Sequence, residues 1–252
     1  MKAPKDQHFL IDFDAVNRIA DTVPVAGRNV LEIGPGGGVL TEALLARGAN
    51  VRAVELDGTL LPNLEERFCE ELKSGQLTIT RGDASKVELP PFDLVVANLP
   101  YSISSKITFR LLDIGFESAV LMYQLEFAKR MAAAFGDKEY GRLSVMAQTY
   151  SDVEFVMELP PNAFNPQPEV WSAVVKITPH EPPVPIKNKK VFEDVVRELF
   201  SHRRKTVRNC LKSLGKKYNI DNLMTNISEE ILNLRPEMLS VEKFIEMSNL
   251  IE

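Results

Sequence analysis

Short apolar runs rich in β-branched residues alternate with amphipathic stretches over residues 29–122, and this alternation constrains the fold more than any other feature of the chain. The runs lie at 30–33, 51–54, 77–80, 94–97 and 119–122. The stretches between and after them predict helices near 40–47, 59–73, 104–113 and 126–134. Because strands that alternate with helices form βαβ units, we predict an α/β protein with a parallel sheet.

The alternation ends after Leu143. A helix is expected to about Tyr150, and two further strands are expected at 153–158 and 171–177, with only a proline-rich loop between them. Strands that are joined without a helix pair in antiparallel fashion, and such edges are common on parallel sheets. We therefore predict a mixed sheet of about seven strands with an antiparallel end.

A proline-rich segment marks the expected domain boundary, because residues 178–186 carry four prolines in nine positions. Beyond it, apolar residues keep helical spacing over 192–200 and 207–214, and Gly215 is a plausible helix stop. Pro236 interrupts the next segment, and Ser240 is a candidate N-cap for a last helix. The prediction is an α/β domain over residues 1–180 and a small all-α domain over residues 181–252.

Charge is distributed unevenly between these two parts. The chain carries a net charge of -5, yet residues 187–217 hold 11 Lys and Arg against 3 Asp and Glu, which is a local charge of +8 and leaves -13 elsewhere. A basic module attached to an acidic body is typical of a protein that contacts nucleic acid through one part only.

Several classes of protein are excluded by composition. No apolar run reaches the ~18 residues of a membrane span, and the first residues lack the apolar stretch of a signal peptide, so we expect a cytoplasmic protein. Cys69 and Cys210 are the only cysteines, far apart and without neighbours at metal-ligand spacing. We therefore expect neither a disulfide framework nor a metal site.

A glycine-rich turn follows the first strand, with the form E-x-G-x-G-x-G from Glu32 to Gly38. The dinucleotide fingerprint G-x-G-x-x-G fails at Val39, and no P-loop is present. The remaining pattern is the one seen in methyltransferases that bind S-adenosylmethionine; the alternative is a tight βα turn without a ligand. Glu55 and Asp83 end the second and third strands. Glu55 could accept hydrogen bonds from the ribose hydroxyls of the cofactor, and Asp83 could accept one from its adenine amine. Taken singly, each could be a solvated carboxylate.

The fourth strand ends in Asn98-Leu99-Pro100-Tyr101, which resembles the N/D-P-P-Y/F motif of enzymes that methylate exocyclic amines of bases. The Asn98 side-chain oxygen and the Leu99 carbonyl could accept the two N6 hydrogens of an adenine, while Pro100 fixes φ and Tyr101 offers a stacking face. A second aromatic should cover the other face of the unstacked base, and Phe164, held outward by a proline-stiffened loop, is the candidate. Trp171 is expected in the core. The alternative for the tetrad is a strand-ending turn with a buried tyrosine.

From end to end, the chain resembles the small-subunit ribosomal RNA adenine N6,N6-dimethyltransferase family. The matching elements are residues 7–10, 32–38, 98–101, 164–172 and 200–211. The resemblance implies a Rossmann-like sheet that binds S-adenosylmethionine and dimethylates two adjacent adenines near the 3′ end of small-subunit rRNA, in step with subunit assembly. The sequence departs from the family pattern at Asp6 and His8, where many members have Gly and Asn, and at Leu99, where many have Ile.

The resemblance also implies a set of site residues. Tyr101 and Phe164 sandwich the target adenine beside Asn98, Leu99 and Pro100. The residues that contact or cover the cofactor are His8, Leu10, Gly34, Gly36, Glu55, Asp83 and Asn98. The partner is the small ribosomal subunit or an assembly intermediate of it, and the protein is expected to act as a monomer.

The basic tail motif predicts its own binding surface. A helix from about Arg203 would align Arg204, Arg208 and Lys212 opposite its apolar face. Together with Lys205 these residues form the predicted RNA-binding set; the alternative is a solvated helix face. Two other functions stay open on the sequence: a DNA adenine N6-methyltransferase and a non-catalytic RNA-binding assembly factor.

Overall fold

The computed structural model describes residues 7–251, so Asp6 lies outside the described residues. Within them the chain divides into two compact units. The first runs to Ala128 and resumes over Val153–Pro179, and the second takes Lys129–Asp152 and continues from His180. The second unit therefore includes a segment, 129–152, that the sequence analysis grouped with the sheet; the functional division into residues 1–180 and 181–252 stays a prediction.

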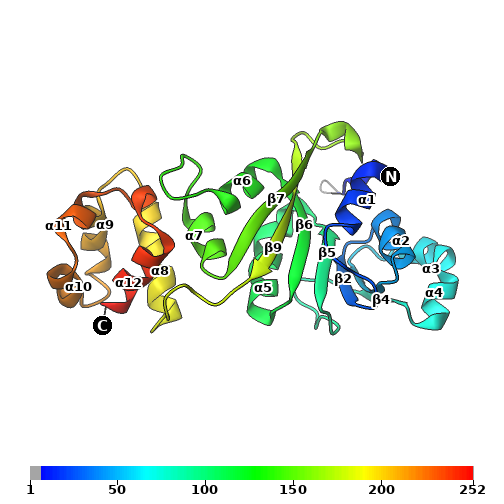
Figure 1. The fold of residues 1–252 in the computed structure, drawn as a ribbon, viewed down its shortest axis with the longest axis horizontal. Helices are drawn as coiled ribbons and strands as arrows, with labels where there is room; N and C mark the ends of the chain where they lie inside the picture. Colours follow the sequence, from blue (N-terminus) through cyan, green and yellow to red (C-terminus); the bar gives the residue numbers. More distant parts are fainter. Residues whose placement is uncertain (1–6, 252) are drawn as a thin grey trace. The chain divides into compact units, whose positions relative to one another are not determined.

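The first unit is built on a seven-stranded sheet in the order β4-β3-β2-β5-β6-β9-β7 (Figure 1). The strands are β2 (Asn29–Ile33), β3 (Asn50–Glu55), β4 (Leu77–Arg81), β5 (Leu94–Asn98), β6 (Ser118–Gln124), β7 (Ser151–Leu159) and β9 (Ser172–Pro179). β2 to β6 pair in parallel, and β9 runs antiparallel to β6, from Ala119 opposite Ile177 to Gln124 opposite Ser172. The predicted mixed sheet with an antiparallel end is thereby confirmed.

Helices follow the parallel strands near the positions that the apolar spacing predicts. They are α2 (Val39–Ala46), α3 (Leu61–Arg67), α4 (Cys69–Ser74), α5 (Ser104–Ile114) and α6 (Leu125–Ala132). A further helix, α1 (Phe13–Ala20), precedes the first parallel strand and was not predicted. The single helix expected over 59–73 is two helices, because the backbone leaves helical geometry at Phe68. The buried Phe68 ring lies so close to Gly38 that a Cβ there would come within 2.5 Å of it. The break thus fits an aromatic ring against the glycine-rich turn.

A small second sheet, which the sequence analysis did not predict, ties the N-terminal segment to the proline-rich loop. β1 (Phe9–Leu10) pairs antiparallel with β8 (Phe164–Asn165), so that Phe9 lies opposite Asn165 and Leu10 opposite Phe164. The amide of Ile11 extends the pairing by donating to the Ala163 carbonyl at 2.9 Å. The N-terminal segment therefore has a defined position against the sheet unit.

The second unit is helical around its own apolar core. Its helices are α7 (Arg142–Gln148), α8 (Lys189–Ser201), α9 (Val207–Leu214), α10 (Asp221–Asn226), α11 (Glu229–Asn233) and α12 (Val241–Asn249). The prediction that α9 begins near Arg203 is wrong. Thr206, in extended conformation, is the N-cap, and residues 202–205 form a turn closed by the bond from the Lys205 amide to the His202 carbonyl at 2.8 Å.

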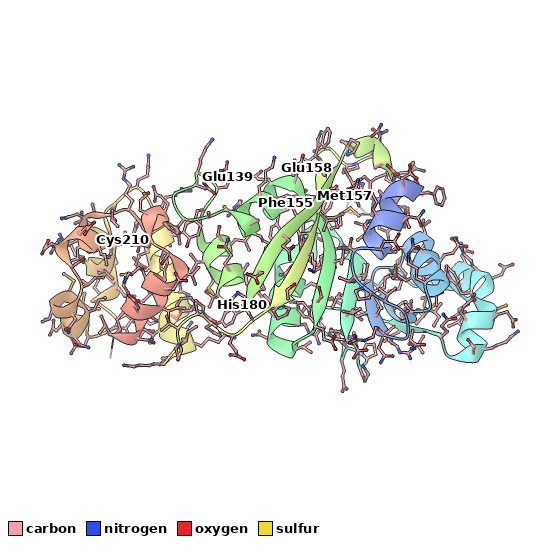
Figure 2. The ribbon with its side chains drawn as sticks, in the orientation of Figure 1. Glu139, Phe155, Met157, Glu158, His180 and Cys210 are labelled. Atoms are coloured by element: carbon pink, nitrogen blue, oxygen red, sulfur yellow. The ribbon has the colours of Figure 1, made fainter. Side chains whose placement is uncertain are left out.

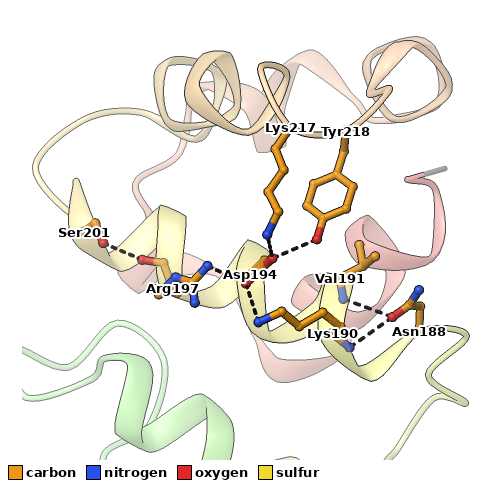
Figure 3. Close-up of polar contacts among 8 residues, drawn as sticks. All are labelled: Asn188, Lys190, Val191, Asp194, Arg197, Ser201, Lys217 and Tyr218. Atoms are coloured by element: carbon orange, nitrogen blue, oxygen red, sulfur yellow. Dashed lines mark hydrogen bonds and ion pairs between the residues drawn. The ribbon is translucent and has the colours of Figure 1, made fainter.

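One carboxylate is buried inside the ionic cluster of this unit (Figure 3). Asp194 on α8 is ion-paired with Lys190, Arg197 and Lys217, and it accepts a hydrogen bond from the Tyr218 hydroxyl at 2.7 Å. The cationic side chains keep contact with solvent while the carboxylate does not. The cluster therefore joins α8 to the residues that follow α9 by electrostatic contacts.

Candidate active site

An open cavity of about 740 Å³, solvent at its mouth included, lies where β2, β3 and β5 end. Its walls are residues 7–10, the glycine-rich turn, Glu55 and the tetrad 98–101. The carboxyl edge of an open α/β sheet is where sites for small molecules and cofactors form. All of the predicted cofactor residues except Asp83 line this cavity.

The glycine-rich turn makes one side of the cavity narrow and leaves no room for a side chain. Gly36 has a φ of 59°, and a Cβ there would come within 2.8 Å of the Phe9 ring. Phe9 in β1 thus packs directly on the turn. Substitution of Gly36 would strain the backbone and displace the N-terminal segment at the same time.

Glu55 is buried at the end of β3 with both carboxylate oxygens oriented by backbone amides. Its Oε1 accepts from the Asp57 amide at 2.7 Å, and its Oε2 accepts from the Gly36 amide at 3.2 Å. Each oxygen has two lone pairs, so a carboxylate held in this way can still accept from a diol. The geometry fits the ribose role that the sequence analysis predicted.

Glu32 lies in the wall of the cavity, although the sequence analysis used it only as a letter of the motif. Its Oε2 accepts a hydrogen bond from the Thr41 hydroxyl at 2.7 Å. Burial, together with the charge of Glu55, raises the pKa of Glu32 to about 8 despite that bond. The carboxyl group of Glu32 is therefore mainly neutral at pH 7. Its place at the first position of the E-x-G-x-G-x-G pattern is the sequence feature that could have identified it as a residue of the site.

Asp83 does not reach the cavity wall. Hydrogen bonds from the Ser85 side chain and from the Ser85 amide at 2.9 Å, together with the ion pair with Lys86 at 3.1 Å, lower the pKa of Asp83 to about 2. The aspartate is held by the turn that follows β4. A contact between Asp83 and the adenine amine of a cofactor stays a prediction.

Asn98 ends β5 with its amide group oriented. Its Nδ2 donates to the His8 carbonyl at 3.0 Å, which leaves Oδ1 as the acceptor end of the side chain. Leu99 is buried and fixes the backbone next to it, and Pro100 follows with φ -56°. The tetrad therefore has the acceptors that its motif predicts, on a backbone that is held on both sides.

Tyr101 is fixed at its hydroxyl and stacked on its ring. The hydroxyl lies 2.6 Å from the Ser172 Oγ on β9, and the His8 imidazole stacks on the ring at a centroid distance of 5.7 Å and an interplanar angle of 29°. Phe164, the predicted partner of Tyr101 against the base, is not among the residues that line the cavity, and its contact with the base stays a prediction.

The expectation that the loop holds Phe164 outward is wrong, since the side chain is only 1% exposed and belongs to the core. The reason is the pairing of β8 with β1, a contact between residues more than 150 positions apart that local sequence does not reveal. The expectation for Trp171 is wrong in the opposite direction. It was expected in the core, but its side chain, just before β9 begins, is 48% exposed.

The predicted RNA-binding residues form no continuous helical stripe, because Arg203, Arg204 and Lys205 precede α9. Arg208 is paired with Glu229, and Arg203 donates to the Lys138 carbonyl at 3.2 Å. Lys212 is exposed on α9. The basic residues thus lie on a turn and a helix of the second unit.

Two further findings bear on the site. Over residues 7–251, no three His, Cys, Asp or Glu side chains gather in a way that could hold a metal ion. Among the same residues, none of the helices has the length and apolar character needed to cross a membrane.

Comparison with known proteins identifies the family. A family model described as ribosomal RNA adenine dimethylase matches residues 2–252. The chain belongs to this family. A protein of Methanospirillum hungatei named probable ribosomal RNA small subunit methyltransferase A is 56% identical over 99% of this chain and 98% of its own length. A protein of the same name from Halobacterium salinarum is 44% identical over 97% of this chain and 88% of its own length.

Solved structures agree with the family. A dimethyladenosine transferase from Plasmodium falciparum superposes with a TM-score of 0.78 at 30% identity, over 95% of this chain and 96% of that one. The 23S rRNA methyltransferase ErmE superposes with a TM-score of 0.71 at 28% identity, over 96% and 99%. The fold is therefore the Rossmann-like methyltransferase fold, and this ribosomal RNA adenine dimethylase is an rRNA adenine dimethyltransferase that uses S-adenosylmethionine.

The cavity of the dimethylase fits that cofactor. Lined by the glycine-rich turn and by the buried Glu55, it can take a nucleoside with two ribose hydroxyls against the carboxylate. His8, Leu10, Gly34 and Asn98 also line it. The individual assignments to the cofactor stay predictions, and Asp83 is the one member of the predicted set that the wall does not include.

Proposed function

We propose that this rRNA adenine dimethyltransferase converts two adjacent adenines near the 3′ end of small-subunit rRNA to N6,N6-dimethyladenine, as a step coupled to subunit assembly. The observation that carries the proposal is the hydrogen bond from the Asn98 Nδ2 to the His8 carbonyl. Because the amide nitrogen is engaged there, Oδ1 is left as the acceptor end of the side chain at the end of β5. The names of its relatives, which are small-subunit methyltransferases, support the choice of RNA. We locate the monomeric enzyme in the cytoplasm, acting on the small subunit or an assembly intermediate.

The chemistry follows from the weakness of the nucleophile, because the adenine N6 lone pair is delocalised into the ring. In the proposed complex, the Asn98 Oδ1 and the Leu99 carbonyl accept the two N6 hydrogens and favour the pyramidal amine. When bound, S-adenosylmethionine supplies an electrophilic methyl group on a sulfonium. The proton that N6 loses after transfer passes to solvent at the open mouth of the cavity. Orientation and hydrogen bonding therefore carry the catalysis.

The cofactor contacts are proposed from the lining of the cavity. Glu55 would accept the ribose hydroxyls, Gly34 and Gly36 would border the nucleoside, and Leu10 would cover it. Asp83 lies in the turn after β4 and would accept from the adenine amine only after its contacts with Ser85 and Lys86 rearrange.

RNA binding is proposed for the basic residues around the start of α9. Arg204, Lys205 and Lys212 are exposed and can neutralise phosphates directly. Arg203 and Arg208 have partners within the protein, so their contribution requires an exchange of those partners for phosphate.

The test is mass spectrometry of small-subunit RNA after incubation of unmethylated subunits with enzyme and S-adenosylmethionine. We expect N6,N6-dimethyladenine at two adjacent positions. Asn98→Ala should reduce methylation roughly 100-fold or more while subunit binding is nearly unchanged, because the lost acceptor acts on the reacting amine. Asn50→Ala is the matched control, since Asn50 begins β3 at the opposite end of the sheet from the cavity and should methylate normally.

The outcomes separate the alternatives. Methylation of duplex DNA alone would identify a DNA methyltransferase. Tight subunit binding without methyl transfer by the wild-type protein would identify an assembly factor. Full activity of Asn98→Ala would remove the proposed chemistry while leaving the family membership intact.

A further inference from the structure

The helical unit carries an exposed aromatic ring beside its basic turn. Phe135, in the loop between α6 and α7, is 58% exposed, and the turn at 202–205 is bonded to the same loop. We propose that this loop, residues 133–141, and the basic turn form an RNA contact site whose residues do not line the cavity. Phe135 stacks there on an unpaired base, while Lys138 and Arg204 bind the adjoining phosphates. The inference rests on the proposed function and deepens it, because it names a further contact with the same RNA.

The loop is closed by its own hydrogen bonds. The Asp137 amide donates to the Ala134 carbonyl at 3.1 Å, and the Ala134 amide donates to the Asp137 carboxylate at 2.9 Å. Gly136 has a φ of 92°, a backbone conformation that favours glycine, and it makes this tight turn directly after the aromatic residue. Phe135 therefore lies at the tip of a preformed turn, so little backbone has to be ordered when a ligand binds.

Two further contacts attach the loop to the helical unit. The Gly136 amide donates to the Glu237 carbonyl at 2.7 Å. Tyr140, only 1% exposed, packs its ring edge-on against Phe200 of α8 at a centroid distance of 6.0 Å. Because Phe200 lies in the last turn of α8, directly before the basic turn, this packing holds the loop next to it.

Arg203 joins the basic turn to the loop directly. Its guanidinium donates to the Lys138 carbonyl at 3.2 Å, although the two residues are 65 positions apart in the chain. Phe135 and Lys138 are neighbours in the same loop, so their Cα atoms lie within about 10 Å, which is the length of about three stacked nucleotides. A short single-stranded segment can therefore contact the ring and the cations at the same time.

The charge of this surface is positive. The loop and the turn together carry four Lys and Arg against two acids. Lys138, Arg204 and Lys205 are exposed. Of the two acids, Asp137 is engaged within the loop by the Ala134 amide, and Glu139 is exposed (Figure 2). Phosphates that approach the ring therefore meet an excess of cations.

The cations around the ring favour RNA over protein as its partner. An exposed ring beside lysine and arginine is the combination that binds single-stranded nucleic acid, because the ring stacks on a base and the cations neutralise phosphates. Phe155 on β7 is also exposed, but it follows the acidic Glu154 (Figure 2). Met238, which follows Glu237, adds exposed apolar surface that a protein could also contact, and the experiment separates these two partners.

The experiment removes the ring and the charge separately. Phe135→Ala lacks the ring, Phe135→Trp keeps one, and Lys138→Gln lacks the charge but keeps the backbone carbonyl that Arg203 uses. One probe is the unmethylated small ribosomal subunit. The other is a single-stranded oligouridine that carries one 2-aminopurine, whose fluorescence is quenched by stacking. Dissociation constants are measured for both probes over a salt series, and circular dichroism verifies that each variant is folded.

We expect Phe135→Ala to weaken the binding of both probes roughly 5- to 100-fold and to lose most of the quenching, because one base–ring contact is lost. Its salt dependence should equal that of the wild-type protein, and Phe135→Trp should restore both affinity and quenching. Lys138→Gln should flatten the slope of log affinity against log salt by about 0.7, because one phosphate contact is lost. The matched controls are Phe155→Ala and Lys73→Gln, at exposed positions of the sheet unit, and both should bind as the wild-type protein does.

Three results would overturn the inference. One is unchanged binding of both probes by Phe135→Ala, and another is a loss in Phe135→Trp or Phe155→Ala as large as that in Phe135→Ala. The third is weaker binding of subunits with normal binding of the oligouridine, which would make Phe135 a contact with a ribosomal protein. A wild-type enzyme that binds both probes as expected but leaves small-subunit adenines unmethylated would instead refute the proposed function, so the two failures are distinguishable.

Discussion

Glu32 in the cavity wall and Asp194 in the helical unit are each only 1% exposed, yet their acidities differ in opposite directions. Burial raises the pKa of Glu32 to about 8, because a single hydroxyl, that of Thr41, is the hydrogen-bond donor that offsets it. Burial also raises the pKa of Asp194, but hydrogen bonds from Lys217 and Tyr218 and the charge of Arg197 outweigh it and hold the pKa well below its usual range.

The difference shows that the same degree of burial serves two purposes. Asp194 is a charged group whose partners come from α8 and from the residues after α9, so it stabilises the helical unit. Glu32 is a neutral group at pH 7 beside a cavity that can take a ligand, and it can gain a charge if a cation comes near. Asp194 thus belongs to a structural ion cluster, whereas Glu32 belongs to the wall of a cavity that can bind a ligand.

The contrast between Asp194 and Glu32 predicts that removal of the Asp194 carboxylate destabilises the helical unit. Asp194→Ala leaves three cations without their common carboxylate and the Tyr218 hydroxyl without its acceptor. We expect a loss of about 2–4 kcal/mol in the free energy of unfolding, at the lower end for a buried pair because the cations reach solvent. Urea unfolding followed by circular dichroism measures it. Glu230→Ala, at an exposed position of α11 in the same unit, is the control that should change little, and an equal loss there would contradict the assignment.

Acid should act on the helical unit through the same residue. Because the pKa of Asp194 is lowered in the folded state, its contribution is complete above the unfolded pKa of about 3.9 and is lost as pH falls below that value. We expect the free energy of unfolding to fall by about 2 kcal/mol more between pH 5 and pH 2.5 in the wild-type protein than in Asp194→Asn. Parallel curves for the two proteins would mean that Asp194 is not the titrating group.

Alkali should act on the other region. The pKa of Glu32 is raised from 4.5 to about 8, so the folded state retains a proton that the unfolded state loses, and stability falls as pH rises between these values. Glu32→Gln removes that dependence, which amounts to at most about 1.4 kcal/mol per pH unit, so the variant should be more stable than the wild-type protein at pH 8 but not at pH 4. Glu42→Gln on the exposed side of α2 is the control. A loss of stability at pH 8 in Glu32→Gln would show that the carboxylate is ionised in the fold.

How much of this was predictable depends on the range of the contacts. The five parallel strands were predicted because each is a local apolar run whose pattern does not need a partner to be recognised. The tetrad 98–101 and Glu55 line the cavity, and that position was predictable because strand ends follow from strand positions. Long-range pairing was not predictable, and it decides the burial of Phe164 and the stacking of His8.

The basic tail shows a second limit. Charged residues four positions apart fit a helix face, but the same spacing runs through the turn at 202–205 before α9. Asp194 was counted only as one negative charge in a basic segment. Its burial depends on Lys217 and Tyr218, more than 20 positions away, which a charge count does not reveal.

The helical unit also contains an ion pair whose carboxylate is exposed, between Arg208 and Glu229, and we expect its removal to have the smallest effect on stability. Glu229→Gln should change the free energy of unfolding by about 0–1 kcal/mol, in contrast to Asp194→Ala. The variant also frees the Arg208 guanidinium for phosphate, so the salt dependence of RNA binding should steepen by about one counterion. Filter binding of small-subunit RNA across a salt series measures it, and Glu230→Gln, the adjacent exposed acid on α11, is the control. Identical slopes in the two variants would mean that Arg208 does not contact RNA, and a large loss of stability would mean that burial is not what separates the two ion pairs.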